Sequence, residues 1–171
     1  MPKKEVALTK RELDVLKLLF NGYDNNKIAE ILHVKRATVK THRFTIMLKL
    51  GVHNLVGLVK YGLKHNLTSL DKDREPSILT SDANNDGLIL SMTKEKLLSL
   101  TEREKEILTM LADGYTNREV GTILNISHHT VEAHRLNIML KLEQTHIVDL
   151  VKFAIKHQLT SVNKHKSNTK H

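Results

Sequence analysis

Two stretches of the sequence, ATVKTHRFTIMLKL at 37–50 and HTVEAHRLNIMLKL at 129–142, each place an unusual set of side chains on the polar outer face of an expected helix. The outward positions are Lys40, Thr41 and Phe44 in the first stretch and Glu132, Ala133 and Leu136 in the second. A lysine donates to guanine O6 and N7, a phenylalanine contacts a thymine methyl, and a glutamate accepts from cytosine N4. The alternative for Lys40 is an ordinary solvated lysine, but Phe44 on the same face favours contact with base edges. The alternative for the second stretch, whose glutamate would repel phosphate, is a degenerate copy kept for packing or protein contact.

Cations, hydroxyls and amides around the same stretches suit the phosphate groups of a nucleic acid. The candidates are Asn25, Lys35, Arg36, Thr38, Arg43 and Lys49 in the first half, and Asn117, Thr130, Arg135 and Lys141 in the second. Such side chains, together with helix N-termini, make most protein contacts to phosphate. For Arg43 and Arg135 an intradomain ion pair with Glu12 and Glu104 is an equally weighted alternative.

The composition offers little support for other chemistry. The 171 residues include no Cys, which excludes disulfides, thiol nucleophiles and cysteine-based metal sites. There are eleven histidines, but His129 and His134 stand five residues apart, off one helical face, and no carboxylate completes a ligand set. The position of His42 and His134 beside the inward helix face favours a semi-buried histidine over a titrating switch. No phosphate loop, nucleophile motif or carboxylate pair is present, so we expect no enzyme activity, metal or cofactor.

The elements that must position these side chains occur twice. Residues 8–70 align without a gap on residues 100–162 at a constant offset of 92, with 29 identities in 63 positions. The sequence therefore predicts two copies of one domain, at 1–70 and 100–162, a linker at 71–99 and a polar tail at 163–171. The end of the linker, ILSMTKEKLLS, is apolar enough to dock on one repeat, with a short helix opened by Thr93.

Charge is divided unevenly between the two repeats. Residues 8–70 hold 11 Lys and Arg against 4 Asp and Glu, whereas residues 100–162 hold 7 against 8. The net charges are thus +7 and −1 in a chain of +8. A basic balance of this kind is typical of proteins that bind nucleic acid, and it assigns most of the expected electrostatic attraction to the first repeat.

The first two helices of each repeat are predicted from their ends. Thr9 and Thr101 are each followed three residues later by Glu, which indicates capping boxes that open a first helix. Gly22 and Gly114 supply the left-handed residue that ends it. Asp24 and Thr116 are the expected N-caps of a second, short helix, and Thr116 with Glu119 forms another capping box.

The third and fourth helices are predicted from their apolar pattern. In the third, Val39, Ile46 and Leu50 are spaced to face inward, which leaves the outer face polar. The fourth segment, NLVGLVKYGLKHN or HIVDLVKFAIKHQ, is apolar around most of its circumference and needs cover from a partner. We therefore expect an all-α protein, with two four-helix domains.

Both repeats resemble the LuxR/NarL/FixJ-type DNA-binding domain, also called the GerE-type helix-turn-helix. The matching stretches are LTKRELDVL and LTEREKEIL, GYDNNKIAEIL and GYTNREVGTIL, and TVKTHRFTIMLKL and TVEAHRLNIMLKL. Repeat 1 departs at Asn26 and Lys27, where the family usually has a basic residue and then Glu, and in repeat 2 Gly121 replaces the usual Ala. The resemblance implies that positions 40, 41 and 44 and their counterparts read bases in double-stranded DNA.

The resemblance also implies that the fourth helices form a dimer contact. The apolar residues suited to it are Leu55, Leu58, Val59 and Leu63, with Ile147, Leu150, Val151 and Ile155 as counterparts. The linker permits these faces to meet within one chain as a pseudo-dimer, or between chains as a homodimer. We expect the intramolecular form, because joining the copies raises their effective concentration.

The expected function is that of a sequence-specific transcription regulator in the cytoplasm. Only MPKKEVA precedes the first repeat, so we expect no sensor domain, and no apolar window is long enough for a membrane span. One alternative is a protein-interaction module that pairs with another regulator or RNA polymerase and binds DNA weakly. A second is a non-specific architectural protein, which the near-neutral second repeat disfavours.

Overall fold

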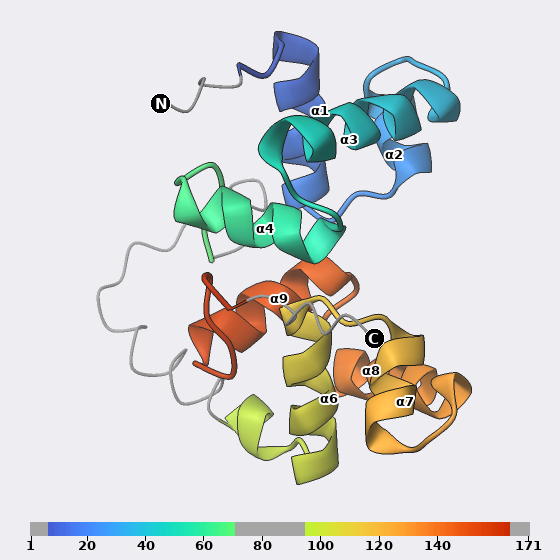
Figure 1. Cartoon of the computed structure of the whole chain (residues 1–171), viewed down its shortest axis with the longest axis vertical. Coiled ribbons are helices and arrows are strands. Elements are labelled where there is room, and N and C mark those ends of the chain that lie inside the picture. The colour runs from blue at the N-terminus through green and yellow to red at the C-terminus, as the bar shows by residue number, and fades with distance from the viewer. Residues whose placement is uncertain (1–6, 71–94, 165–171) are drawn as a thin grey trace, which may run out of the picture.

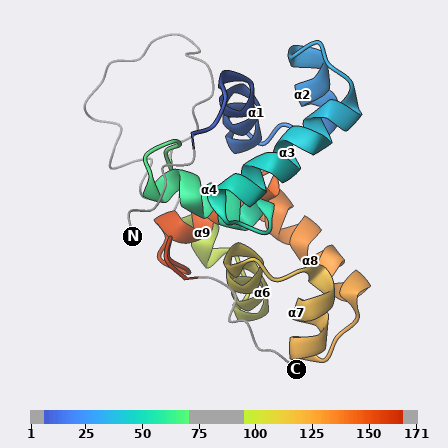
Figure 2. The same ribbon diagram turned by 45° about the horizontal axis from the view of Figure 1, so that its top comes forward.

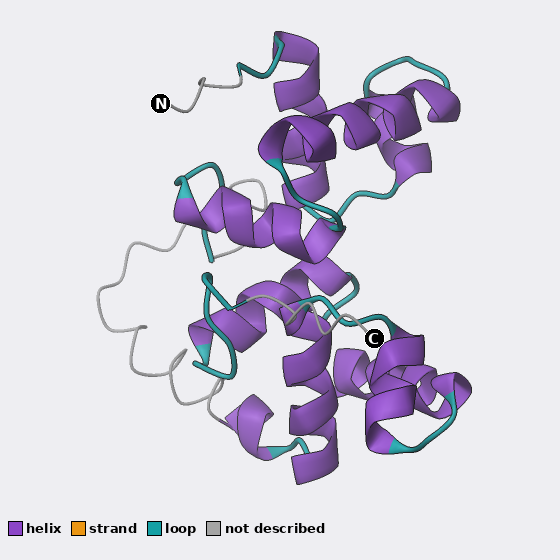
Figure 3. Cartoon of the chain, viewed as in Figure 1, coloured by secondary structure: helices purple, strands orange, loops and turns teal. Residues whose placement is uncertain are grey.

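A computed structural model describes residues 7–70 and 95–164. All regular elements in these two ranges are helices, which confirms the predicted all-α class (Figures 1 and 3). Repeat 1 contains α1 (Lys10–Phe20), α2 (Asn25–Ile31), α3 (Arg36–Leu50) and α4 (Leu55–Lys64). Repeat 2 contains α6 (Glu102–Asp113), α7 (Asn117–Leu124), α8 (His128–Lys141) and α9 (Ile147–Lys156). A turn of helix at 95–98 precedes α6, whereas Thr93, the expected start of a linker helix, lies outside the described residues.

The predicted helix ends are present. Thr9 and Thr101 each form a complete capping box, and so does Thr116. Gly22 and Gly114 have φ of 83° and 98°, a region that costs glycine nothing. The side chain of Asp24 accepts from the Lys27 amide at 2.8 Å, so α2 keeps its cap although Lys27 stands where repeat 2 has Glu.

The backbone takes the same unusual turns at equivalent positions of the two repeats. His33 and Asn125 have φ of 52° and 54°, and Asn66 and Gln158 have 54° and 59°. Gly51 and Glu143 follow α3 and α8 with φ of 66° and 53°. Because a non-glycine residue rarely adopts this region, repeated occurrence at an offset of 92 shows that both copies have one backbone design.

An arginine on the first helix of each repeat holds the end of the second helix. Arg11 Nη2 donates to the Leu32 carbonyl at 2.5 Å, and Arg103 Nη2 donates to the Leu124 carbonyl at 3.0 Å. These carbonyls lie at a helix C-terminus, where no intrahelical partner is available. The two arginines therefore fix the helix-turn-helix on the first helix.

The core of each repeat lies between the inner faces of its helices. Val39 and Ile46 of α3 are fully buried, as are Val131 and Ile138 of α8, and Leu50 packs partly buried against the core. The inward face predicted for the third helix is thus observed, and it leaves the opposite face of α3 and α8 in solvent.

The two repeats pack against each other through α4 and α9, which lie side by side in the middle of the molecule (Figures 1 and 2). Leu58 and Val59 of α4 and Leu150 and Val151 of α9 are completely buried. The flanking residues Leu55, Leu63, Ile147 and Ile155 are partly buried against the core. The apolar fourth helix of each repeat is therefore covered by the fourth helix of the other repeat.

The N-terminal ends of α4 and α9 make pseudo-symmetric contacts with the opposite repeat. Asn54, which caps α4, donates from Nδ2 to the Gly114 carbonyl at 3.4 Å. Its counterpart His146 lies so close to Gly22 that an added Cβ there would stand 2.7 Å from His146 Cδ2. Because Gly22 and Gly114 have no Cβ, the residues before α9 and α4 can pack directly against the opposite repeat.

Candidate nucleic-acid interface

The outer face of α3 presents the three residues expected to read bases. Lys40 and Thr41 are exposed, and Phe44 is 65% exposed. The Thr41 hydroxyl donates to the Ala37 carbonyl at 3.1 Å, which directs it along the helix. A large aromatic side chain held in water has no role in the core, so Phe44 is free to contact a group outside the repeat.

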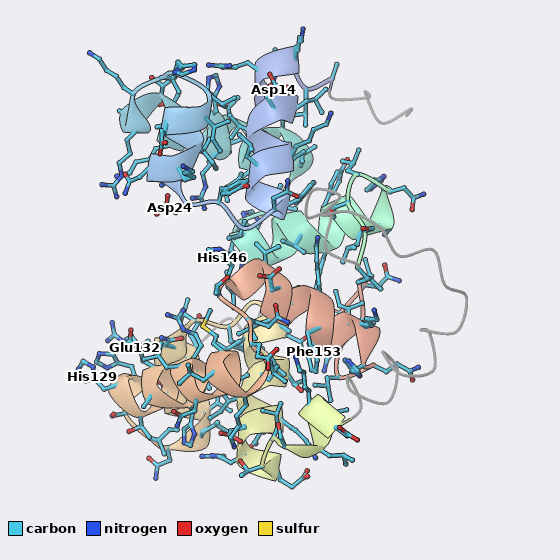
Figure 4. The ribbon with its side chains drawn as sticks, turned by 180° about the vertical axis from the view of Figure 1, so that it is seen from behind. Asp14, Asp24, His129, Glu132, His146 and Phe153 are labelled. Carbon is cyan, nitrogen blue, oxygen red and sulfur yellow. The ribbon has the colours of Figure 1, made fainter. Side chains whose placement is uncertain are left out.

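The equivalent face of α8 has the same geometry and different chemistry. Glu132 and Ala133 are exposed, and Leu136 is 53% exposed. Figure 4 shows Glu132 and His129 near one end of α8, on the outer side of repeat 2. The His128 and His129 rings lie 3.9 Å apart between centroids. The face thus offers an acceptor and aromatic nitrogens where α3 offers an ammonium group.

The N-termini of these two helices also differ. Lys35 is the N-cap of α3 and makes no side-chain cap bond, and Arg36 follows it. In repeat 2 the Ser127 side chain caps α8, accepting from the Thr130 amide at 3.0 Å and lying 2.8 Å from its hydroxyl. A serine directly before a helix is an ordinary start signal, so the cap at Ser127 could have been predicted from the sequence. Two cations at the uncapped end of α3 oppose the helix dipole, an arrangement that a bound phosphate would relieve.

The alternative that Arg43 and Arg135 pair with Glu12 and Glu104 is wrong. Lys49 Nζ lies 2.8 Å from Glu12 Oε2, and Lys141 Nζ lies 2.7 Å from Glu104 Oε2. The last turn of the third helix, and not its middle, therefore crosses the start of the first helix. Both lysines have an intradomain role, and their contact with phosphate stays a prediction.

These two buried glutamates ionise more easily than usual. Hydrogen bonds from the Lys49 ammonium and the Thr9 amide lower the pKa of Glu12. Burial raises the pKa of Glu104, but hydrogen bonds from Lys141 and Thr101 outweigh it, so that this pKa is lowered too. Each carboxylate joins the N-cap of the first helix to the last turn of the third helix. The ion pair thereby fixes the angle between these two helices, and with it the direction of the exposed face.

Arg43 and Arg135 lie instead toward the junction of the repeats. Arg43 Nη1 donates to Asn25 Oδ1 at 2.5 Å, and burial lowers the pKa of Arg43. Arg135 Nε is buried without a hydrogen-bond partner. Both side chains line a cleft of about 350 Å³ between the repeats, together with Arg36 and His146. Sequence spacing could not indicate this cleft, since it forms only when α4 meets α9.

The structure thus joins two exposed third helices through their fourth helices. The other candidates are exposed at Thr38 and Thr130 and partly buried at Asn25 and Asn117. Within the described ranges no three His, Asp or Glu side chains gather as a metal site. No helix in those ranges is both long and apolar enough to pass through a bilayer.

The fold and the exposed third helices define a helix-turn-helix protein, and comparison with known families agrees. The model of bacterial regulatory proteins of the luxR family matches the chain twice, over residues 6–61 and 98–154. These two regions make up more than half of the chain. The protein therefore belongs to the LuxR family, as a tandem of two of its DNA-binding helix-turn-helix domains.

Several curated proteins are similar to parts of the chain. The uncharacterized response regulatory protein YgeK of Escherichia coli is 51% identical over 57 residues, 33% of this chain and 39% of that protein. Oxygen regulatory protein NreC of Staphylococcus carnosus is 31% identical over 142 residues, 83% of this chain and 63% of that protein. Transcriptional regulatory protein MctR of Rhizobium johnstonii is 44% identical over 62 residues, 36% of this chain and 29% of that protein. The chain therefore spans less than two thirds of each relative, and no solved structure matches it significantly.

Proposed function

We propose that this protein is a sequence-specific regulator of transcription that places one recognition helix from each repeat, α3 and α8, in the major groove of double-stranded DNA. The observation that carries the proposal is the pair of equivalent exposed faces, Lys40 to Phe44 and Glu132 to Leu136, on repeats joined by α4 and α9. Two covalently joined repeats present two recognition helices to one duplex, as symmetric dimers of helix-turn-helix domains do. A DNA-binding role also favours the cytoplasm as its location.

The two half-sites read by the protein differ. Lys40 donates to guanine and Phe44 contacts a thymine methyl, whereas Glu132 accepts from cytosine and Leu136 makes an apolar contact. Phosphate contacts come from the N-terminal ends of the second and third helices and from the arginines near the junction. The residues assigned to phosphate are Asn25, Lys35, Arg36, Thr38, Arg43, Asn117, Thr130 and Arg135. The expected operator is therefore an imperfect inverted repeat.

A salt titration tests the proposal. Duplexes selected from a random library are compared with a scrambled duplex of equal length, at several salt concentrations. We expect the selected duplex to bind roughly 10³-fold or more tighter at physiological salt. Equal affinities for the two duplexes, falling steeply with salt, would instead identify an architectural protein.

A second candidate function is contact with another regulator or with RNA polymerase. It is favoured by Leu48 and Leu140, equivalent residues of α3 and α8 that are 65% and 77% exposed. Weak binding to every duplex, combined with saturable capture of RNA polymerase by the full chain, would support this candidate. Replacement of both leucines by Gln separates the functions, since it should abolish capture and leave binding to the selected duplex within a few fold.

The assembly has its own test, because the fourth helices also fit a homodimer. We propose that the chain is a monomer whose α4 and α9 pair internally. Light scattering at micromolar concentration should give the mass of one chain. A stable species of twice that mass would support pairing between chains and four recognition helices per particle.

A further inference from the structure

The cleft between the repeats is unusually rich in arginine. It is lined from repeat 1 by Arg36 and Arg43, and from repeat 2 by Arg135 and the start of α9. Arg43 and Arg135 are counterparts in the two repeats, so the cleft lies near the pseudo-two-fold axis. Because the repeats form opposite walls, any group bound here touches both halves of the molecule at once.

The two inner guanidinium groups have no carboxylate partner among the described residues. Arg43 donates to the neutral Asn25 side chain, and Arg135 Nε is buried without a hydrogen bond. The carboxylate that lines the cleft, Asp24, accepts from the Lys27 amide as the cap of α2. Placing two like charges in a partly desolvated cleft is unfavourable unless an anion joins them.

The start of α9 adds backbone donors to the same wall. His146 is the N-cap of α9 and makes no side-chain cap bond, and the next residues, Ile147 and Val148, line the cleft. The counterpart of His146 is Asn54, which caps α4 by accepting from the Gly57 amide at 2.7 Å. Of the two equivalent helix starts, the one at the arginine-lined cleft thus lacks a side-chain cap. First-turn amides are good donors to oxyanions.

We propose that this cleft is a phosphate-binding site in which Arg43, Arg135 and the first-turn amides of α9 bind one oxyanion. Arginine suits this role, since its planar group donates two parallel hydrogen bonds to phosphate. The cleft lies between the two third helices, because Arg36 and Arg43 of α3 and Arg135 of α8 line it. Figure 4 labels His146, which also lines it, where the repeats meet. The oxyanion therefore comes either from the DNA backbone near the centre of the operator or from a small phosphate compound. The first source rests on the proposed function, and the second does not.

The first measurement uses the full chain without DNA and inorganic phosphate as the probe. Thermal unfolding is recorded in rising phosphate against chloride of equal ionic strength, for the wild type, Arg135→Gln, Arg43→Gln and Lys64→Gln. Arg135→Gln is the sharpest variant, because it removes no hydrogen bond seen in the described residues. Lys64 is the matched control, since it loses the same charge at the exposed far end of α4. A bound phosphate should give a saturable rise in midpoint in the wild type and Lys64→Gln, largely lost in the two arginine variants.

The second measurement identifies the source of the phosphate. Binding of a selected duplex is followed against salt for the same variants. If the phosphate belongs to DNA, Arg135→Gln should lower the slope of log affinity against log salt by about one, and Lys64→Gln should leave it unchanged. An unchanged slope combined with loss of the phosphate-dependent midpoint rise would identify a small phosphate compound.

The site is overturned if Arg43→Gln and Arg135→Gln behave like Lys64→Gln in both measurements. Failure of the proposed function looks different. In that case the wild type does not discriminate between selected and scrambled duplexes, while the phosphate-dependent rise in midpoint, measured without DNA, still tests the cleft.

Discussion

The two repeats share the residues that build the domain and differ in those that face outward. Both keep the lysine bound to the first-helix glutamate, at 2.8 Å and 2.7 Å, and both keep the arginine that holds the end of the second helix. At the outer face of the third helix, however, Lys40 is replaced by Glu132, and at the start of that helix Lys35 is replaced by Ser127. The duplication therefore retained one scaffold and gave it two different outer surfaces.

The interface between the repeats is asymmetric as well. Lys60 of α4 is completely buried, and its Nζ lies 3.2 Å from Asp113 Oδ1 at the end of α6. Burial lowers the pKa of Lys60, and the hydrogen bond from its ammonium to Asp113 opposes that shift. The position equivalent to Asp113 in repeat 1 is Asn21. Lys152, the counterpart of Lys60, is buried as well. Pairing of two first repeats would place Lys60 against a neutral side chain, so the Lys60–Asp113 ion pair requires one copy of each repeat.

The largest effect is expected from breaking this asymmetric ion pair. Asp113→Asn gives repeat 2 the residue of repeat 1 and leaves Lys60 buried without its carboxylate. We expect the free energy of unfolding to fall by about 3 to 5 kcal/mol, measured by urea denaturation. Asn21→Ala, at the exposed equivalent position, should cost no more than about 0.5 kcal/mol. Similar losses in the two variants would contradict a one-sided interface.

The next largest effect, on DNA binding, is expected from the outer faces of α3 and α8. Lys40→Ala should weaken binding to the selected duplex by about 1 to 3 kcal/mol and relax one base position. Glu132→Lys should raise affinity for random DNA and reduce discrimination at a position in the other half-site, because it exchanges an acceptor for a cation. Both are read from binding to single-base variants of the selected duplex. A uniform loss for Lys40→Ala on all duplexes would make Lys40 a phosphate contact, and no change for Glu132→Lys would keep α8 out of the groove.

A smaller loss of stability is expected when the buried glutamate of the first helix is replaced, and this loss should be equal in the two repeats. The pKa values of Glu12 and Glu104 are lowered on folding from an ordinary value of 4.5, so their ionisation adds stability above that pH. This contribution is lost as the pH falls through the lowered values. Glu12→Gln and Glu104→Gln should each cost about 1 kcal/mol at pH 7, as the loss of a cap does. Each variant should also lose less stability than the wild type between pH 5 and pH 3, in urea titrations at fixed pH. A variant with the wild-type acid profile would show that its glutamate is not the titrating group.

Prediction from sequence succeeded where the signal is local. Capping residues and apolar spacing lie within one helix, so the helices and the outward position of Phe44 follow from short stretches of chain. One of the two alternatives left open for Arg43, an ion pair with Glu12, was wrong, because Lys49 makes that pair. The two cations are less than two helical turns apart, so only the crossing angle of the helices decides between them. It could not indicate the buried Lys60 or the unpartnered Arg135 Nε, since both result from contact between the repeats. A lysine within an apolar segment such as LVGLVKYGL was the one available signal.

A loss no larger than that at the glutamates should come from Gly121 of α7, which stands where repeat 1 has Ala29 and packs against the turn between the second and third helices. Gly121 is buried, and an added Cβ would stand 2.7 Å from the Ile126 carbonyl oxygen and 3.3 Å from the His128 amide nitrogen. Gly121→Ala gains up to about 1 kcal/mol of helix propensity, but the clash is with backbone atoms that cannot rotate away. Overpacking of this kind costs roughly 1 to 3 kcal/mol, so we expect a net loss of about 1 kcal/mol in urea denaturation. Ala29→Gly has no such clash and should lose about 1 kcal/mol from propensity alone. If Gly121→Ala instead stabilises the protein, the turn at Ile126 shifts at little cost. The backbone around position 121 can then accept an alanine as readily as the backbone around Ala29 does.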